Sequence, residues 1–252
     1  MGVHTFVVDG LDQAVVGGDV SFTGSEAHHA AQVVRVRAGE MIDLVDGAGR
    51  RITGEVTSTQ RDRVDVRVRV SVLEPPPQPR LTVVQALAKS DRGERAVESL
   101  TEVGVDVIVP WSAAHSVVRW DAERARRGVD RWRSTAHAAA KQARRAHHPH
   151  VLDIHTSDDV AALVSASTLA LVLDEEASTP ITAYDVPDSG EVLLIVGPEG
   201  GISDQERELF ASAGAVPARL GPTVLRTSTA GTVAAGIVLS STSRWTDARM
   251  EP

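Results

Sequence analysis

The sequence LLIVGPEGGISDQE, at residues 193–206, contains an apolar run, a glycine-rich loop and a helix-capping pattern, in that order. The apolar run predicts a buried strand, and the glycines permit positive φ angles and close approach of a ligand to the backbone. Ser203 and Glu206 have the spacing of a capping box, which predicts the start of a helix. Strand, loop and helix N-terminus meet in this way at the ligand sites of open α/β sheets. A tight turn without a ligand has the same pattern, so the choice depends on the rest of the chain.

From residue 81 onward, strand-like and helix-like segments alternate. Apolar runs predict strands at residues 81–87, 107–110, 116–118, 169–173, 192–196 and 216–220. Capping patterns and helical periodicity predict helices at residues 91–104, 122–146, 203–214 and 229–240. Continuous strands rich in Val and Leu that alternate with helices are typical of a parallel sheet buried on both faces. The expected fold class of this part is therefore α/β.

The first 73 residues have a different pattern. Short strands are expected at residues 5–8, 19–23, 39–47, 51–56 and 63–70. In the last of these, valines alternate strictly with charged residues, which indicates a half-buried antiparallel strand. Residues 25–35 predict one helix with Ser25 as its N-cap. Several short strands in so few residues suggest a small β-barrel.

Residues 74–80 hold four prolines in seven positions, which favours a stiff linker that continues neither helix nor sheet. The predicted organisation is a β-barrel at 1–73, a proline-rich linker at 74–80 and an α/β domain at 81–252.

Composition excludes several classes of protein. The chain has no cysteine, which excludes a disulfide framework and a thiolate metal site. No apolar run approaches the roughly 20 residues of a membrane span. The N-terminus lacks the basic and apolar regions of a signal peptide. We therefore expect a soluble, cytoplasmic protein.

The net charge of −8 argues against a protein that binds nucleic acid over its whole surface, but the charge is unevenly distributed. Residues 117–150 carry nine basic and three acidic side chains, a net charge of +6. Such a stretch is typical of a phosphate-binding patch. A solvated helix face has the same composition, so both interpretations stay open at this point.

A second glycine-containing loop, RLGPTVLRT at residues 219–227, lies directly before the last predicted helix. Neither glycine loop has the spacing of the dinucleotide-binding or P-loop motif. No lysine follows Lys141 to serve as a P-loop lysine.

The two segments LIVGPEGGISDQE and RLGPTVLRTSTA together resemble the RsmE family of SPOUT-class methyltransferases. The resemblance covers nearly the whole chain and includes residues 29–49, 86–92 and 101–105. It implies methylation of N3 of a uridine in bacterial 16S ribosomal RNA, with S-adenosyl-L-methionine as the cofactor. It also implies a PUA-like N-terminal β-barrel that binds RNA, a C-terminal SPOUT domain with a parallel sheet and a trefoil knot, and a homodimer that acts on the 30S subunit.

The resemblance also implies a set of cofactor-binding residues at the end of the strand 169–173 and in the two loops. They are Leu173, Gly197, Pro198, Gly200, Gly201, Leu220, Gly221, Val224 and Leu225.

Methyl transfer to N3 requires loss of a weakly acidic imide proton, which needs a general base or a cation near the uracil oxygens. Arg226 is the first candidate, because a guanidinium is a forked donor for phosphate or uracil oxygens. A helix cap or a structural ion pair is the alternative role for Arg226. Glu199 is the second candidate, as a base, a partner of the cofactor amine or, preferably, an organiser of its loop.

Basic residues of both domains are candidates for RNA contacts. They are Arg35, Arg37, Lys89, Arg92, Arg124, Arg131 and Arg144. The few aromatic residues argue against a base-stacking platform, so recognition should depend on RNA shape and phosphates. The histidines at 28–29 and 147–150 lack partners with metal-ligand spacing, and no metal is expected.

The chain departs from the family pattern at Ser228, where the family often has Glu, so a carboxylate role at that position is in doubt. Two alternatives to the main hypothesis remain. One is another SPOUT methyltransferase, acting on a 2′-hydroxyl or on tRNA. The other is a non-catalytic RNA-binding protein of ribosome assembly.

Overall fold

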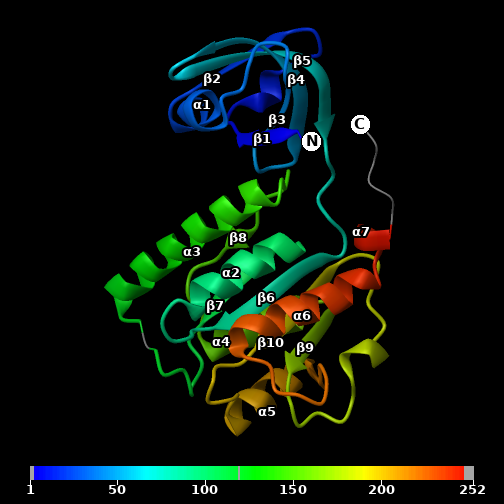
Figure 1. Cartoon of the computed structure of the whole chain (residues 1–252). Coiled ribbons are helices and arrows are strands. Elements are labelled where there is room, and N and C mark those ends of the chain that lie inside the picture. The colour runs from blue at the N-terminus through cyan, green and yellow to red at the C-terminus, as the bar shows by residue number, and fades with distance from the viewer. Residues whose placement is uncertain (1–2, 119, 247–252) are drawn as a thin grey trace. The chain divides into compact units, whose positions relative to one another are not determined.

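A computed structural model describes residues 3–118 and 120–246, which fall into two compact units (Figure 1). The N-terminal unit contains the residues up to Pro76 together with Ala140–His148, and the C-terminal unit contains Pro77–Ala139 and the chain from Pro149 onward. The boundary between the units thus falls inside the proline-rich segment. The sequence did not indicate that residues 140–148 belong with the N-terminal unit.

Hydrogen bonds explain the placement of residues 140–148. The Lys141 ammonium donates to the Glu26 carboxylate at 2.7 Å, and the amide of Gly49 donates to the carbonyl of Ala146 at 3.0 Å. The preceding helix, α3 (Ala122–Gln142), ends four residues before the predicted end at 146. Arg144 adopts a left-handed φ of 55°, which no continuous α-helix accommodates.

The N-terminal unit contains one sheet of five strands in the order β1-β3-β4-β5-β2. The strands are β1 (His4–Val7), β2 (Asp19–Thr23), β3 (Met41–Val45), β4 (Arg50–Gln60) and β5 (Arg63–Leu73). β1 and β3 are parallel and the other pairs are antiparallel. Val64, Val66 and Val68 of β5 are buried, while Asp65 and Arg67 between them are half-buried and exposed, respectively. This confirms the half-buried antiparallel strand that the alternation predicted.

The helix predicted at residues 25–35 is divided, and its predicted cap is wrong. The structure has α1 (Ser25–His28) followed by a π-helical turn, η2 (His29–Val34), and an earlier 3-10 turn, η1 (Leu11–Gln13). Gly24, not Ser25, occupies the N-cap position, with φ 79° and ψ −148°, a conformation that glycine accepts at little cost. The π-helical turn ends at Arg35, which has a left-handed φ of 63°.

The C-terminal unit contains a sheet of six parallel strands in the order β11-β9-β10-β6-β7-β8. The strands are β6 (Arg80–Ala86), β7 (Val107–Trp111), β8 (His150–Val151), β9 (Leu169–Leu173), β10 (Glu191–Val196) and β11 (Val216–Ala218). β10, which precedes the glycine loop, lies between β9 and β6 near the middle of the sheet. The predicted parallel sheet is therefore confirmed.

Helices cover both faces of this sheet (Figure 1). The helices other than α3 are α2 (Arg92–Val103), α4 (Ser157–Ala166), η3 (Ile181–Ala183), α5 (Asp204–Ser212), α6 (Thr227–Ser240) and α7 (Ser243–Thr246). One core cluster joins α2, α3 and α6 to alternate residues of β6 and β10, such as Leu81 and Leu194. A second cluster joins α4 and α5 to the intervening residues of β6 and β10, such as Val84 and Ile195, on the other face of the sheet. Burial on both faces explains why these strands are continuously apolar.

The sequence-based assignment contains one wrong strand and several omissions in this unit. Residues 116–118 do not form a strand, because Ser116 lies in a turn where its amide donates to the carbonyl of Ala113. The helices α4 and α7 and the two-residue strand β8 were not predicted.

The capping box at the start of α5 is present and extends beyond the helix. Glu206 is only 4% exposed and accepts hydrogen bonds from the amide of Ala114 and the hydroxyl of Ser157, both at 2.8 Å, as well as from Ser203. Burial raises the pKa of Glu206, but the hydrogen bonds from Ala114, Ser203 and Ser157 outweigh it and hold the pKa below its ordinary value. One carboxylate thus joins α5, α4 and the segment after β7.

We expect Glu206→Gln to lower the free energy of unfolding at pH 7 by about 2–3 kcal/mol, because an amide presents a donor where the carboxylate accepts. Since the folded-state pKa of Glu206 is lowered, its contribution is complete above the ordinary value of 4.5 and is lost as the pH falls through the folded-state pKa. Urea unfolding at pH 7 and at acid pH measures both effects. Glu208→Gln, an exposed position on the same helix, is the control; equal stability of the two variants at pH 7 would contradict the assigned role.

Candidate functional site

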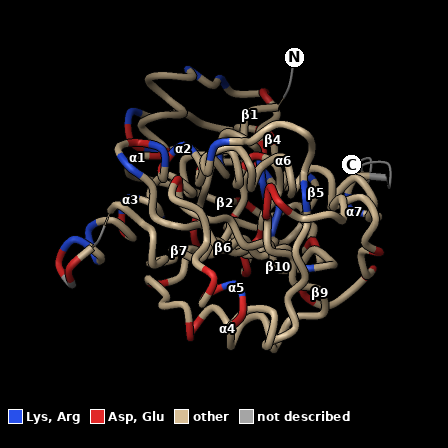
Figure 2. Tube along the Cα trace, turned by 90° about the horizontal axis from the view of Figure 1, so that it is seen from below, with Lys and Arg blue, Asp and Glu red and all other residues tan. Residues whose placement is uncertain are grey.

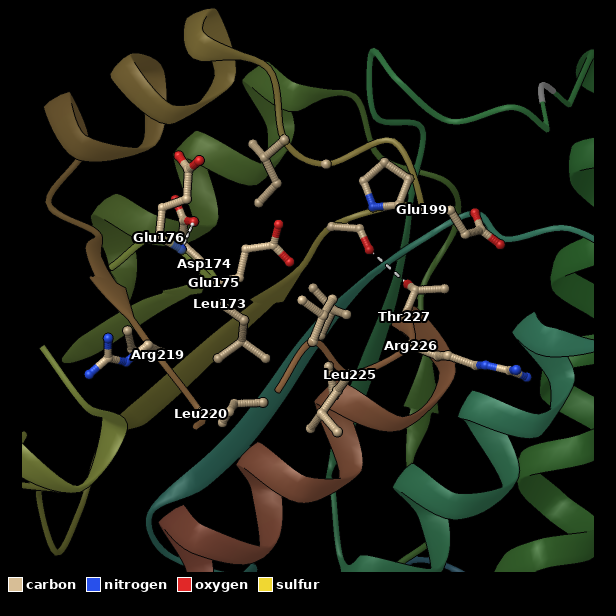
Figure 3. Close-up of a pocket in the computed structure, with 18 of the residues that line it drawn as sticks. Leu173, Asp174, Glu175, Glu176, Glu199, Arg219, Leu220, Leu225, Arg226 and Thr227 are labelled. Carbon is tan, nitrogen blue, oxygen red and sulfur yellow. Dashed lines mark hydrogen bonds between the residues drawn. The ribbon is translucent and has the colours of Figure 1, made fainter. Parts of the chain in front are cut away.

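Three loops of the C-terminal unit surround a cavity of about 560 Å³ (Figure 3). They follow β9, β10 and β11, whose carboxyl ends meet at one edge of the sheet because the strands are parallel. The volume lies in the range of roughly 300–1,000 Å³ that is usual for small-molecule sites. The lining includes all the residues predicted to bind a cofactor: Leu173, Gly197, Pro198, Gly200, Gly201, Leu220, Gly221, Val224 and Leu225.

The loop after β10 contains glycine because the neighbouring chain leaves no room for side chains. A Cβ at Gly197 would lie 2.7 Å from Cγ1 of Ile202, and a Cβ at Gly200 would lie 3.0 Å from Cβ of His115. Gly201 has a φ of 75°, in the left-handed region that favours glycine. The backbone of this loop is therefore bare on the cavity side, where a ligand can approach it.

The loop after β11 supplies apolar side chains and one buried hydroxyl. Leu220 and Leu225 gather with Leu173 at one wall of the cavity (Figure 3). Thr227, the first residue of α6, is buried, and its hydroxyl donates to the carbonyl of Gly197 at 2.7 Å. This hydrogen bond connects the two glycine-containing loops.

An acidic edge of the cavity was not among the predicted site residues. Asp174, Glu175 and Glu176 follow β9 directly and line the cavity (Figure 3). The Arg207 guanidinium lies 3.0 Å from Asp174 and 3.7 Å from Glu176, whereas Glu175 makes no ion pair with any residue that the structure describes. A run of acidic residues at the end of a predicted strand was the sequence signal for this edge. Further lining residues that were missed are Val196, Ile202, Arg207, Ala218, Arg219, Thr227 and Ala230.

Glu199 forms an ion pair with Arg92, whose Nη1 lies 2.9 Å from its Oε1. Partial burial raises the pKa of Glu199, but hydrogen bonds from its own amide, from the Arg92 guanidinium and from the amide of Lys89 outweigh that effect. The pKa of Glu199 is therefore below its ordinary value, and the group is a carboxylate at neutral pH. Such a group has little tendency to accept a proton.

Arg226 lies at the same end of the cavity as Glu199, and its side chain is exposed (Figure 3). It occupies the N-cap position of α6, but its side chain makes no capping hydrogen bond. No ion pair to Arg226 exists within the described part of the chain. Neither structural role considered for Arg226, the helix cap or the ion pair, is therefore present.

The residues predicted to contact RNA are distributed over both units. Arg35, Arg37 and Arg144 lie in the N-terminal unit, and Lys89, Arg92, Arg124 and Arg131 lie in the C-terminal unit. All are exposed except Arg92, which is half-buried.

Acidic residues lie among the arginines at the start of α3, as Figure 2 shows. Arg124 lies 3.5 Å from Asp121 and Arg131 lies 3.4 Å from Glu94. Exposed pairs of this kind contribute about 0–1 kcal/mol, so they leave the guanidinium groups available to a phosphate.

Two negative findings apply to residues 3–118 and 120–246. No three His, Asp or Glu side chains in these ranges are grouped in a way that could hold a metal ion. None of the helices in the same ranges has the length and the apolar character that a bilayer crossing requires.

Comparison with known families gives two matches. Residues 74–239 match the RNA methyltransferase domain family, and residues 22–69 match the RNA methyltransferase PUA domain family. Among curated proteins, the ribosomal RNA small subunit methyltransferase E of Mycobacterium bovis is 43% identical over 95% of this chain and 92% of its own length. The protein of the same name from Bacillus subtilis is 31% identical over 83% of this chain and 85% of its own.

Solved structures include close matches that contain a cofactor. A methyltransferase from Legionella pneumophila, in complex with bound S-adenosylmethionine, superposes with a TM-score of 0.82 at 26% identity and covers 96% of this chain and 99% of its own. A ribosomal RNA small subunit methyltransferase E from Neisseria gonorrhoeae, bound to S-adenosyl methionine, has a TM-score of 0.81 at 26% identity and covers 95% and 98%.

We expect Gly197→Ala to weaken the binding of S-adenosylmethionine, the cofactor that the sequence resemblance implies, because the added methyl group overlaps Ile202 and must displace the loop at a cost of about 1–3 kcal/mol. Thermal unfolding and titration calorimetry measure stability and affinity. Gly221→Ala adds the same methyl group on the facing loop with no atom within 4 Å, and should leave the stability of the free protein unchanged. If Gly197→Ala binds the cofactor with wild-type affinity, close approach of the ligand to the backbone of this loop is not important for binding.

Proposed function

This chain belongs to the RNA methyltransferase family represented by ribosomal RNA small subunit methyltransferase E, and we propose that it methylates 16S ribosomal RNA with S-adenosyl-L-methionine, at N3 of one uridine. The observation that carries the proposal is the convergence of both glycine-containing loops on one cavity of suitable size. Methylation of ribosomal RNA follows from the family, and the N3 position follows from the resemblance of the two loops to the RsmE family.

The residues around the cavity fit this cofactor. S-adenosylmethionine combines a flat aromatic adenine ring, which has apolar faces and polar edges, with a cationic sulfonium and an amino group. Leu173, Leu220 and Leu225 form an apolar wall that would hold the ring. Glu175 is a carboxylate without an ion-pair partner among the described residues and would attract the cationic part. The backbone of Gly197–Gly201 would supply polar groups at close range.

When bound, S-adenosylmethionine supplies an electrophilic methyl group, and the chain must then position the uridine and make N3 nucleophilic. N3 is an imide nitrogen, and loss of its proton places negative charge on O2 and O4. Arg226 lines the cavity, has no ion-pair partner among the described residues and would donate to these oxygens as the charge develops. The side chain lowers the energy of the anion without itself accepting a proton, and the N3 proton passes to solvent water.

Glu199 contributes through Arg92 in this proposal. Its lowered pKa makes it a poor general base, but the ionised carboxylate holds the Arg92 guanidinium at the cavity edge. Arg92 and Arg226 then present two positive groups to the RNA strand that carries the uridine. The exposed arginines of both units would contact further phosphates.

The partners and the setting follow from this function. We propose 16S rRNA within the 30S subunit as the substrate. Exposed arginines can contact the phosphates of a folded RNA, whereas recognition of single-stranded RNA usually needs aromatic side chains that stack on bases, and this chain has few of them. A homodimer, a trefoil knot in the C-terminal unit and a cytoplasmic location complete the proposal, and all three rest on the family resemblance.

The test incubates the purified protein with labelled S-adenosylmethionine and 30S subunits from a strain that lacks the activity. We expect N3-methyluridine in the nuclease digest. A methyl group on ribose would indicate a 2′-O-methyltransferase, and label incorporated only into tRNA would indicate a tRNA enzyme. Failure to bind the cofactor at all would leave a non-catalytic RNA-binding protein.

Arg226→Ala should fold normally and lose about 100-fold or more of the transfer rate, since removal of one donor to a developing anion costs about this much. Arg219→Ala removes another exposed arginine from the cavity lining and should cost less than about tenfold. The measurement is the single-turnover rate with saturating cofactor. Equal losses in both variants would mean that only the total positive charge matters.

The pH dependence of the rate separates the possible roles of Glu199. Because its folded-state pKa lies below its ordinary value of 4.5, Glu199 stays ionised above that pH and should contribute no rise in rate between about pH 6 and 9. Glu199→Gln removes the ion pair that orients Arg92, so it should raise the KM for the RNA substrate. The pH profile of the rate should stay that of the wild type. Disappearance of a rise in rate near neutral pH in this variant would identify Glu199 as the base after all.

A further inference from the structure

Gln85 is a polar residue in the most buried part of the C-terminal sheet. It lies on β6, next to the central strand β10, and its exposed fraction is 0%. Its neighbours on the strand, such as Val83, Val84 and Ala86, are apolar and equally buried. Gln85 does not line the cavity. An amide in this position needs a physical reason.

The amide of Gln85 begins a directed chain of hydrogen bonds. Its Nε2 lies 3.0 Å from the hydroxyl of Thr227, and that hydroxyl lies 2.7 Å from the carbonyl of Gly197. A hydroxyl has one proton, which Thr227 gives to the carbonyl, so Thr227 accepts from Gln85. The carbonyls of Thr227 and Ala86, at 3.3 and 3.4 Å from Nε2, are also acceptors and fix the orientation of the amide.

The other atom of the same amide is unsatisfied. Oε1 of Gln85 is buried and has no hydrogen-bond partner in the described part of the chain. Gly231 of α6 lies close by, and a Cβ there would approach Oε1 to 3.5 Å and Val196 to 3.2 Å, so the helix packs tightly over this atom. An unsatisfied buried acceptor lowers stability. An apolar side chain of similar size would avoid this cost, so folding alone does not explain Gln85.

We propose that Gln85 is a positioning residue for the cofactor site. Through the hydroxyl of Thr227 it holds the carbonyl of Gly197 and the start of α6 in one arrangement, which sets the distance between the two loops. The chain joins β6, α6 and the end of β10, three elements that no local sequence signal brings together. The identity of the ligand rests on the function proposed above, whereas the mechanical role of Gln85 does not.

The test uses three variants: Gln85→Met, Thr227→Val and the double variant that combines these two substitutions. Thr227→Ser, which keeps the hydroxyl, is the control. Hydrogen–deuterium exchange of the free protein reports on residues 197–201 and 223–230, with α4 as an internal reference. We expect faster exchange in both loops for Gln85→Met and Thr227→Val and no change in α4. Titration calorimetry should show S-adenosylmethionine binding that is roughly three- to tenfold weaker in these variants. Thr227→Ser should stay within about twofold of the wild type.

The relation between stability and affinity separates positioning from a purely structural role. The midpoint of urea unfolding of Gln85→Met should be unchanged or higher, because the unsatisfied acceptor is removed together with the donor. The double variant should bind no more than about twofold more weakly than either single variant, since both break one chain.

Wild-type exchange in both loops of Gln85→Met, or affinity within about twofold of the wild type, would overturn the proposal. Should Gln85→Met not fold, Thr227→Val interrupts the same chain and decides the question by the same measurements. A wild-type protein that fails to bind S-adenosylmethionine would refute the proposed function, while the exchange data would still decide the role of Gln85.

Discussion

The hydrogen bond from the Thr227 hydroxyl to the Gly197 carbonyl is the constraint on which the cavity depends. It connects the end of the central strand β10 to the start of α6, and so fixes the two loops that form opposite walls. Within the loop after β10, glycine is required at position 197 because a Cβ there would lie 2.7 Å from Cγ1 of Ile202. A cavity built from backbone in this way keeps its shape without long side chains, which lose conformational entropy when a ligand orders them.

Charge is separated across the cavity. Asp174, Glu175 and Glu176 lie along the edge that follows β9, whereas Arg226 lies at the end that holds Glu199 (Figure 3). Arg92 belongs to the same end, because it pairs with Glu199. A cationic methyl donor and a polyanionic acceptor require opposite potentials within one site. Ion pairs moderate the charge at both ends, because Arg207 neutralises part of the acidic edge and Glu199 pairs with Arg92. At the Glu199 end, Arg226 makes no ion pair with any residue that the structure describes.

Patterns confined to single elements predicted most of the fold. The strand 169–173 and the Ser203–Glu206 capping box were predicted to the residue, because burial on both faces and a cap each leave a local signature. The predicted end of the helix at residue 146 was wrong, because α3 ends at Gln142, two residues before Arg144 adopts a left-handed φ. Side-chain periodicity continues through such a residue, so it carries no signal of the break.

By itself, the sequence determined the α/β class of the larger unit, the β-rich smaller unit and, through two loop motifs, the family. These are properties of short segments, and periodicity, glycine and proline record them directly. Only the tertiary structure decided that the acidic run after β9 shares a cavity with both loops, and that buried Gln85 reaches Thr227 from a strand 142 residues away. Such contacts depend on strand order and helix packing, because residues distant in sequence have no pattern in common until the sheet brings them together.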